Sequence, residues 1–269
     1  MKTTTYFLRF GVFLLLLSAF AGCKKDKEVT PEVTDSVPVT PTIPGAGSAT
    51  LSFSNMAGSA ALQLSSSGYY ITGNNDSLIV DIYKYYVSNF QLVKEDGSTH
   101  SFPESYFLID AAKPSSLTPV LNNIPPGNYT AIRFLLGVDS TRNVSGAQTG
   151  ALDPANGMFW TWSTGYIMAK LEGSSPQSGA ANKSVVLHIG GFSGSNSALK
   201  NIEMPFPSKV VINDQSKPTI SIKSDMLEWF KSPNNIDLSN IYNTMLPGSS
   251  SKSIAANYAD MFSLSGVSY

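Results

Sequence analysis

The sequence predicts an all-β fold, an antiparallel β-sandwich with a short C-terminal helix. From Ala49 onward, apolar and polar residues alternate with a period of two, and Gly, Pro, Asn and Asp bound the alternating runs. Only 14% of the 269 residues are charged, so Ser, Thr, Asn and Gly must supply much of the polar surface, as in many extracytoplasmic β proteins. The segment that follows residue 47 is long enough to bury one large core.

Most of the expected strands follow directly from this alternation. Residues 78–93 fit either two strands or one long bulged strand. The pair Asp96-Gly97 favours a tight hairpin turn after this segment, and the sequence Pro-Pro-Gly-Asn at 125–128 favours another turn. The strands are expected at residues 50–54, 78–93, 106–110, 129–138, 166–172, 185–190, 198–204, 209–212 and 219–223.

Helical content is expected to be small. Residues 225–230 could form one or two turns. The strongest helical pattern covers residues 253–262, where Ile254, Tyr258 and Phe262 recur every four residues. This spacing places them on one side of a helix, as an apolar stripe that could dock on the sheet.

The first 22 residues are predicted to be a bacterial lipoprotein signal. Lys2 and Arg9 form its positive region, an apolar run follows, and Ala21-Gly22 precede Cys23, the only cysteine in the chain. The apolar run is too short to span a bilayer comfortably. Cleavage would leave Cys23 as the lipidated N-terminus and the lipid anchor as the contact with the membrane. The expected location is the bacterial envelope, as an outer-membrane lipoprotein.

Residues 23–47 are predicted to form a flexible tether before a domain at 48–269. The tether holds four prolines and too few apolar residues to offset the entropy of ordering it. Its charged cluster at 24–28 resembles export signals that direct some bacterial lipoproteins to the cell surface, although a solvated spacer would look the same. Loss of Lys2 and Arg9 with the signal takes the formal net charge from −1 to −3, which argues against a nucleic-acid partner.

The densest group of unusual residues lies between 137 and 191. A long polar loop there leads to Met158, Trp160 and Trp162, which are two residues apart. On an extended backbone such residues project to the same face. We therefore expect a row of one thioether and two indoles at the rim of the sandwich.

The same region resembles a known family. The sequence LDP at 152–154 is followed by MFWTW at 158–162, GY at 165–166 and LEG at 171–173, with YYVSN at 85–89 upstream. This series resembles the MbnP-like copper-binding proteins, bacterial envelope proteins associated with copper and methanobactin handling. The resemblance implies a β-rich fold. It also implies a copper site in which histidine is paired with a tryptophan that a partner diheme enzyme oxidises to kynurenine.

The candidate ligands follow from the few donors that the chain offers. The two histidines are His100 and His188, and no cysteine remains after lipidation, so a zinc site of Cys and His ligands is excluded. An intact indole nitrogen only donates hydrogen bonds, whereas a ring-opened tryptophan exposes an aniline nitrogen. Monovalent copper accepts soft ligands, including the thioether of methionine. The predicted copper site therefore draws on His188, Trp160, Trp162, Met158 and His100.

Two functions stay open at this point. The first is an envelope lipoprotein that binds copper for storage or transfer. The alternative is a cell-surface module that binds glycan or protein through an aromatic platform of Trp160, Trp162 and Tyr166. An enzyme is not expected, because the sequence holds no nucleophile elbow, phosphate loop, paired-carboxylate spacing or His-rich metal motif.

Overall fold

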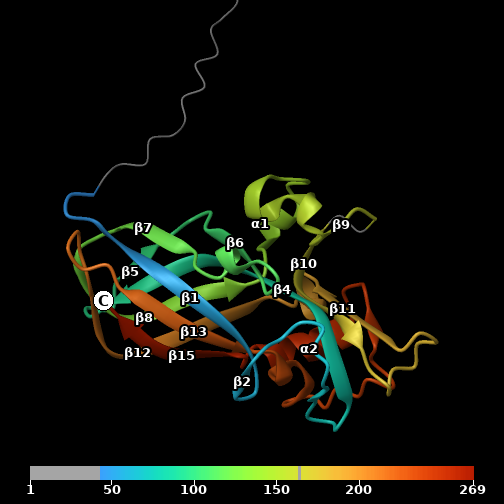
Figure 1. The fold of residues 1–269 in the computed structure, drawn as a ribbon. Helices are drawn as coiled ribbons and strands as arrows, with labels where there is room; N and C mark the ends of the chain where they lie inside the picture. The colour runs from blue at the N-terminus through green and yellow to red at the C-terminus, as the bar shows by residue number, and fades with distance from the viewer. Residues whose placement is uncertain (1–42, 163–164) are drawn as a thin grey trace, which may run out of the picture. The chain divides into compact units, whose positions relative to one another are not determined.

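Two β-sheets pack face to face in the computed structural model, which describes residues 43–162 and 165–269 (Figure 1). The predicted signal, Cys23 and residues 24–42 of the predicted tether lie outside these residues. The first sheet has the strand order β15 (Phe262–Ser268), β13 (Thr219–Asp225), β1 (Gly47–Ala57) and β2 (Ala60–Ala61), with β7 (Val120–Ile124) also paired to β1.

The second sheet is larger and is built around β4 (Ser77–Lys94). Its strand order is β12 (Lys200–Ile212), β8 (Gly127–Leu136), β4, β10 (Gly165–Ser174), β11 (Ser184–Gly190) and β14 (Asn243–Thr244). Four short strands extend it. These are β3 (Tyr70–Ile71), β5 (Thr99–Ser101) and β6 (Tyr106–Asp110), all paired to β4, and β9 (Phe159–Trp160), paired to β10.

The predicted β-sandwich is confirmed, and most of its neighbouring strands are antiparallel. The pairs β1–β13 and β11–β14 are parallel and depart from the prediction. Parallel strands need a long crossover between them, and more than 150 residues separate β1 from β13. Local alternation carries no information about such a distant pairing.

Aromatic side chains from both sheets fill the space between them. Phe53 of β1 and Phe262 of β15 face Tyr85 of β4 and Phe134 of β8. The ring centroids lie 5.1–6.5 Å apart in edge contacts, the geometry that aromatic pairs prefer. These contacts join β1 and β15 to the central strands of the second sheet.

Residues 77–94 form one strand, so the long-strand interpretation is the correct one. The strand continues through a bulge, where the pairing with β8 shifts between Ser88 and Gln91. Asn89 has a φ of 52° within this bulge, a left-handed conformation that asparagine tolerates better than most residues. The hairpin at Asp96-Gly97 is confirmed, because β5 pairs back onto β4 directly after it.

The helix near the C-terminus is confirmed, with different bounds and a strand after it. Helix α2 spans Ser249–Tyr258, and Ile254 and Tyr258 are fully buried. Phe262 does not continue the helical stripe, because it begins β15. The described part of the chain also contains the short helix α1 (Ser140–Asn143). Its 3-10 turns are η1 (Pro114–Ser116), η2 (Gly150–Leu152), η3 (Pro154–Asn156), η4 (Gly194–Asn196) and η5 (Met226–Phe230). Among the described residues, no helix is long and apolar enough to cross a bilayer.

Candidate functional site

A row of charged and imidazole side chains crosses four neighbouring strands on one face of the larger sheet. Asp110 of β6 pairs with Lys84 of β4, Lys84 with Lys170 of β10, and Lys170 with His188 of β11. Side chains that are directly opposite in a sheet share one face. The alternate residues of β10 and β11 point to the other face and join the buried core.

His188 is held in this row with one ring nitrogen bonded and the other buried without a partner. Its Nε2 lies 2.7 Å from Oε1 of Glu172. Its Nδ1 is buried and has no hydrogen-bond partner among the described residues. An ionised carboxylate only accepts hydrogen bonds, so the proton belongs on Nε2 and Nδ1 keeps its lone pair. Burial lowers the pKa of His188, which favours this neutral form.

Lys170 connects the row to the loop above it. Its Nζ donates a hydrogen bond of 2.6 Å to the carbonyl oxygen of Gly157 and lies 3.6 Å from Oε1 of Glu172. Burial lowers the pKa of Lys170, and Glu172 opposes that shift. The loop before β9 is therefore tied to the face of the sheet that carries His188.

Trp160 lies on the same face as His188. A Cβ atom placed on Gly190 would be 2.3 Å from Cζ3 and 2.5 Å from Cη2 of Trp160, so the indole packs directly against this glycine. Gly190 and His188 are two residues apart on β11, which puts them on one face about 7 Å apart. The indole Nε1 is also buried without a hydrogen-bond partner among the described residues. The indole therefore packs on β11 two residues away from His188, on the face that carries the imidazole.

Trp162 lies outside this buried arrangement. Strand β9 ends at Trp160, so the expected alternation does not continue to Trp162, which is 62% exposed. Its ring centroid is 6.3 Å from that of Trp160, with 39° between the ring planes. Trp162 therefore covers the outer side of the Trp160 ring.

Met158 is fully buried, and its carbonyl oxygen accepts a hydrogen bond of 2.9 Å from the backbone N–H of Ile167. Trp160 and Tyr166 are 2% and 1% exposed. These two rings cannot form the surface platform that the alternative function requires. Of the three aromatic residues proposed for that platform, only Trp162 is open to solvent.

His100 is not brought to His188. It lies on β5 opposite Leu92 of β4. Its ring packs edge-on against that of Phe102, with 4.7 Å between the ring centroids. Lys84, on the same cross-strand row as His188, is eight residues from Leu92 along β4. At about 3.3 Å per residue, the two histidines are offset by roughly 25 Å along the strand direction alone.

A polar network fixes the long loop over this face. Both carboxylate oxygens of Asp139 are used. Oδ1 caps α1 by accepting from two backbone N–H groups, and Oδ2 accepts from Asn89 and Tyr106. The buried Asn143 accepts a hydrogen bond of 2.8 Å from the backbone N–H of Tyr166. Sequence patterns gave no sign of this network, apart from the general tendency of aspartate to cap helices.

A cavity of about 120 Å³ opens beside the Trp160 indole. Its walls come from the start of β10, from the segment after β11 and from the loop before α2, and they include Asn143, Gly165, Phe192 and Pro247. The cavity leads to the edge of the buried ring. It is large enough for a few atoms of a ligand and too small for a sugar residue to enter fully.

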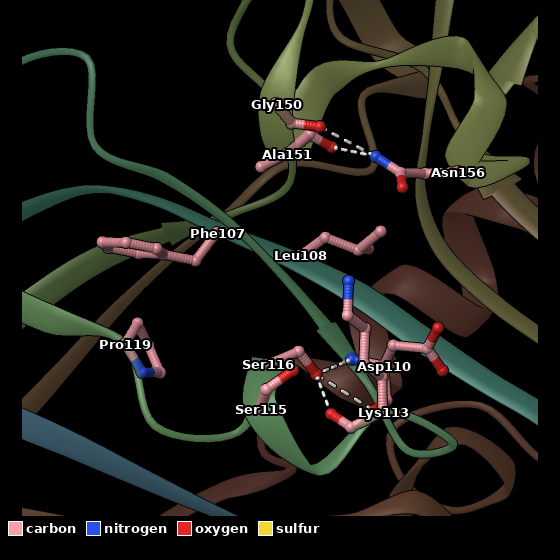
Figure 2. A pocket seen from close by; sticks show the side chains of 10 residues that line it. All are labelled: Phe107, Leu108, Asp110, Lys113, Ser115, Ser116, Pro119, Gly150, Ala151 and Asn156. Atoms are coloured by element: carbon pink, nitrogen blue, oxygen red, sulfur yellow. Dashed lines mark hydrogen bonds between the residues drawn. The ribbon is translucent and has the colours of Figure 1, made fainter.

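A second cavity, of about 280 Å³, lies at the Asp110 end of the row (Figure 2). Figure 2 shows the Lys113 ammonium group turned toward the middle of this opening, with Phe107 and Pro119 on one side. The carboxylate of Asp110, which lines this cavity, forms an ion pair with Nζ of Lys84 at 2.9 Å. The residues predicted for the copper site do not line this cavity.

The donors near His188 are few. Within residues 43–162 and 165–269, no group of three or more His, Cys, Asp or Glu side chains is arranged to hold a metal ion. Sequence reasoning did not anticipate the Glu172 carboxylate as a partner that holds the His188 ring, nor Gly190 as the surface under Trp160. These residues share one face of β10 and β11 only because of the register between the two strands, which the sequence alone does not reveal.

Comparisons with known proteins agree with the resemblance seen in the sequence. The family model of MbnP matches residues 46–247. No curated protein matches the chain. Among solved structures, MbnP from Methylosinus trichosporium is 15% identical, with a TM-score of 0.49, over 72% of this chain and 80% of that chain. Since the family model covers well over half of the sequence, this protein belongs to the MbnP family.

Proposed function

We propose that this protein is a bacterial envelope lipoprotein that binds copper at His188 and an oxidised Trp160, and that it stores the ion or passes it on. The observation that carries the proposal is the buried, unpartnered Nδ1 of His188 on the same face as the Trp160 indole. A neutral imidazole with a free lone pair is what a metal ion requires of histidine.

The residues present fit copper only if Trp160 is modified. The intact indole Nε1 is a donor and cannot act as a ligand, whereas opening the ring to kynurenine would supply an aniline nitrogen close to His188. A soft monovalent ion suits such a low-coordinate nitrogen site. Trp160 is preferred over Trp162 because it packs on Gly190 while Trp162 faces solvent. Modification by a diheme tryptophan-oxidising partner is part of this proposal.

A competition titration of monovalent copper tests the site. Protein from the native host would be compared with His188→Gln and, as the matched control, His100→Gln. We expect His188→Gln to weaken binding at least about tenfold, which corresponds to a loss of about 1.4 kcal/mol, while His100→Gln binds as the wild type does. Equal affinity in the wild type and His188→Gln would remove the proposed site.

Peptide mapping tests the modification separately. The tryptic cleavage sites nearest to the two indoles are Arg142 and Lys170, so one peptide, 143–170, contains both Trp160 and Trp162. Fragmentation of this peptide from native-host protein should place the mass change on Trp160. An unmodified Trp160 in copper-loaded protein would contradict the proposed ligand.

The lipoprotein part of the proposal depends on Cys23. Replacement with serine should abolish incorporation of labelled fatty acid and should move the protein out of the membrane fraction. Retention of the label in Cys23→Ser would contradict anchoring at this residue.

A second function is supported by one observation, the 62% exposure of Trp162. An exposed indole can stack on a sugar face or on a partner protein. Binding to a glycan array that is lost in Trp162→Ala but unaffected by a copper chelator would favour this function. Binding that Trp162→Ala leaves unchanged would oppose it.

A further inference from the structure

We propose that Glu172 is a positioning residue that fixes the His188 ring and presents its Nδ1 as the metal-binding nitrogen. The inference rests on the proposed copper function and adds to it a named nitrogen and a named supporting side chain. Glu172 and His188 come from adjacent antiparallel strands, β10 and β11. In their register Glu172 is opposite Val186 and His188 is opposite Lys170, which makes the two residues diagonal neighbours on one face.

The contact between them is short and directional. The distance from Nε2 of His188 to Oε1 of Glu172 is 2.7 Å, which is typical of a hydrogen bond to an ionised acceptor. Diagonal neighbours in an antiparallel sheet are within reach of long side chains. The strand register therefore sets this hydrogen bond, and the imidazole ring is limited in its rotation.

A second contact holds the carboxylate in place. Lys170 lies between Glu172 and the covering loop, with its Nζ 3.6 Å from Oε1 of Glu172 and 2.6 Å from the carbonyl oxygen of Gly157. A carboxylate oxygen that is hydrogen-bonded to the ring acts as the acceptor, so Nε2 of His188 is the donor. The proton of His188 is thereby directed to Nε2.

The other ring nitrogen is left available for a ligand. Nδ1 of His188 is buried and lacks a hydrogen-bond partner among the described residues. Histidines that bind metals usually donate their second N–H to a carboxylate or carbonyl group, and loss of that partner typically weakens metal binding by about 10–100-fold. The Glu172–His188 pair has this arrangement. Nε2 donates to the carboxylate, and Nδ1 is the nitrogen left to bind the metal.

Nitrogen-15 NMR of the histidine rings in metal-free protein tests the assignment without copper. We expect the wild-type His188 signals to show the Nε2–H tautomer, with the His100 signals identified by their loss in His100→Gln. Glu172→Ala should give a mixture of tautomers. Glu172→Gln keeps an acceptor oxygen and should retain the Nε2–H form. Glu203, an exposed residue paired with Arg133, provides the control variant Glu203→Ala, which should leave the His188 signals unchanged.

Copper titration of the same variants completes the test. Affinity should fall by about 10–100-fold in Glu172→Ala, should be restored at least in part in Glu172→Gln, and should stay at the wild-type value in Glu203→Ala. Should Glu172→Ala fail to fold, the wild-type and Glu172→Gln spectra still decide the tautomer. A wild-type Nδ1–H tautomer, or Nε2–H signals and copper affinity unchanged by Glu172→Ala, would overturn the positioning role. Absence of copper binding in wild-type protein that shows the Nε2–H form would instead overturn the proposed function.

Discussion

Replacing Gly190 with alanine should destabilise the domain through a single added methyl group. The new Cβ would lie 2.3 Å from Cζ3 and 2.5 Å from Cη2 of Trp160, well inside van der Waals contact. The ring must therefore move or the strands must separate. Such overpacking typically costs about 1–3 kcal/mol. Strand propensity alone predicts the opposite sign, because glycine weakens a strand relative to alanine.

Thermal unfolding followed by circular dichroism measures this effect. For a domain of this size, each kcal/mol shifts the midpoint by about 2–4 °C, so Gly190→Ala should lower it by roughly 5 °C. Gly127→Ala is the matched control, because the nearest atoms to its added Cβ are 3.9 Å away. Its midpoint should stay close to the wild-type value. A Gly190→Ala protein as stable as this control would refute the packing of Trp160 on β11.

Three further changes test other parts of the site. Lys170→Met removes the hydrogen bond to the carbonyl oxygen of Gly157 while keeping the aliphatic stem. It should lower the free energy of unfolding by about 1 kcal/mol and speed amide exchange at the start of β9. Unchanged exchange would contradict the idea that Lys170 holds this loop on the sheet. Burial lowers the pKa values of His188 and His100, so below the ordinary histidine pKa of about 6.5 the unfolded chain binds more protons than the folded chain does. The free energy of unfolding should therefore fall as the pH drops below that value. Urea unfolding at several pH values should show a smaller fall in His188→Gln than in the wild type. Trp162→Phe should change stability by less than about 0.5 kcal/mol and remove most of the acrylamide-quenchable fluorescence, whereas Trp160→Phe should leave that quenching in place.

Local patterns predicted the strands well because alternation reports which residues face the core. The segment 106–110 coincides with β6, and the strand expected at 185–190 is β11 with one more residue. Segments 198–204 and 209–212 proved to be one strand, β12, whose pairing shifts register between Pro205 and Val210. Pro205 and Pro207, which lie between the two expected segments, are tolerated because β12 is an edge strand.

The candidate site was only partly predictable for a related reason. Spacing placed Trp160 and Trp162 on one face, but that rule fails where the strand ends, and β9 ends at Trp160. The neighbours of Trp160 and His188 come from distant parts of the chain, and their contacts depend on the register of β10 with β11. No local pattern encodes that register, so Glu172 and Gly190 became visible only in the fold.

Strand β15 has a consequence for how the interior is completed. Phe262 contacts Phe53, Tyr85 and Phe134 across the two sheets, and β15 forms the outer edge of the first sheet beside β13. A nascent chain that has not yet produced this strand has the contact between Phe53 and Tyr85 but lacks the ring of Phe262, which packs against both of them and against Phe134. The packing between the two sheets is therefore completed only after residue 262 has been added to the chain.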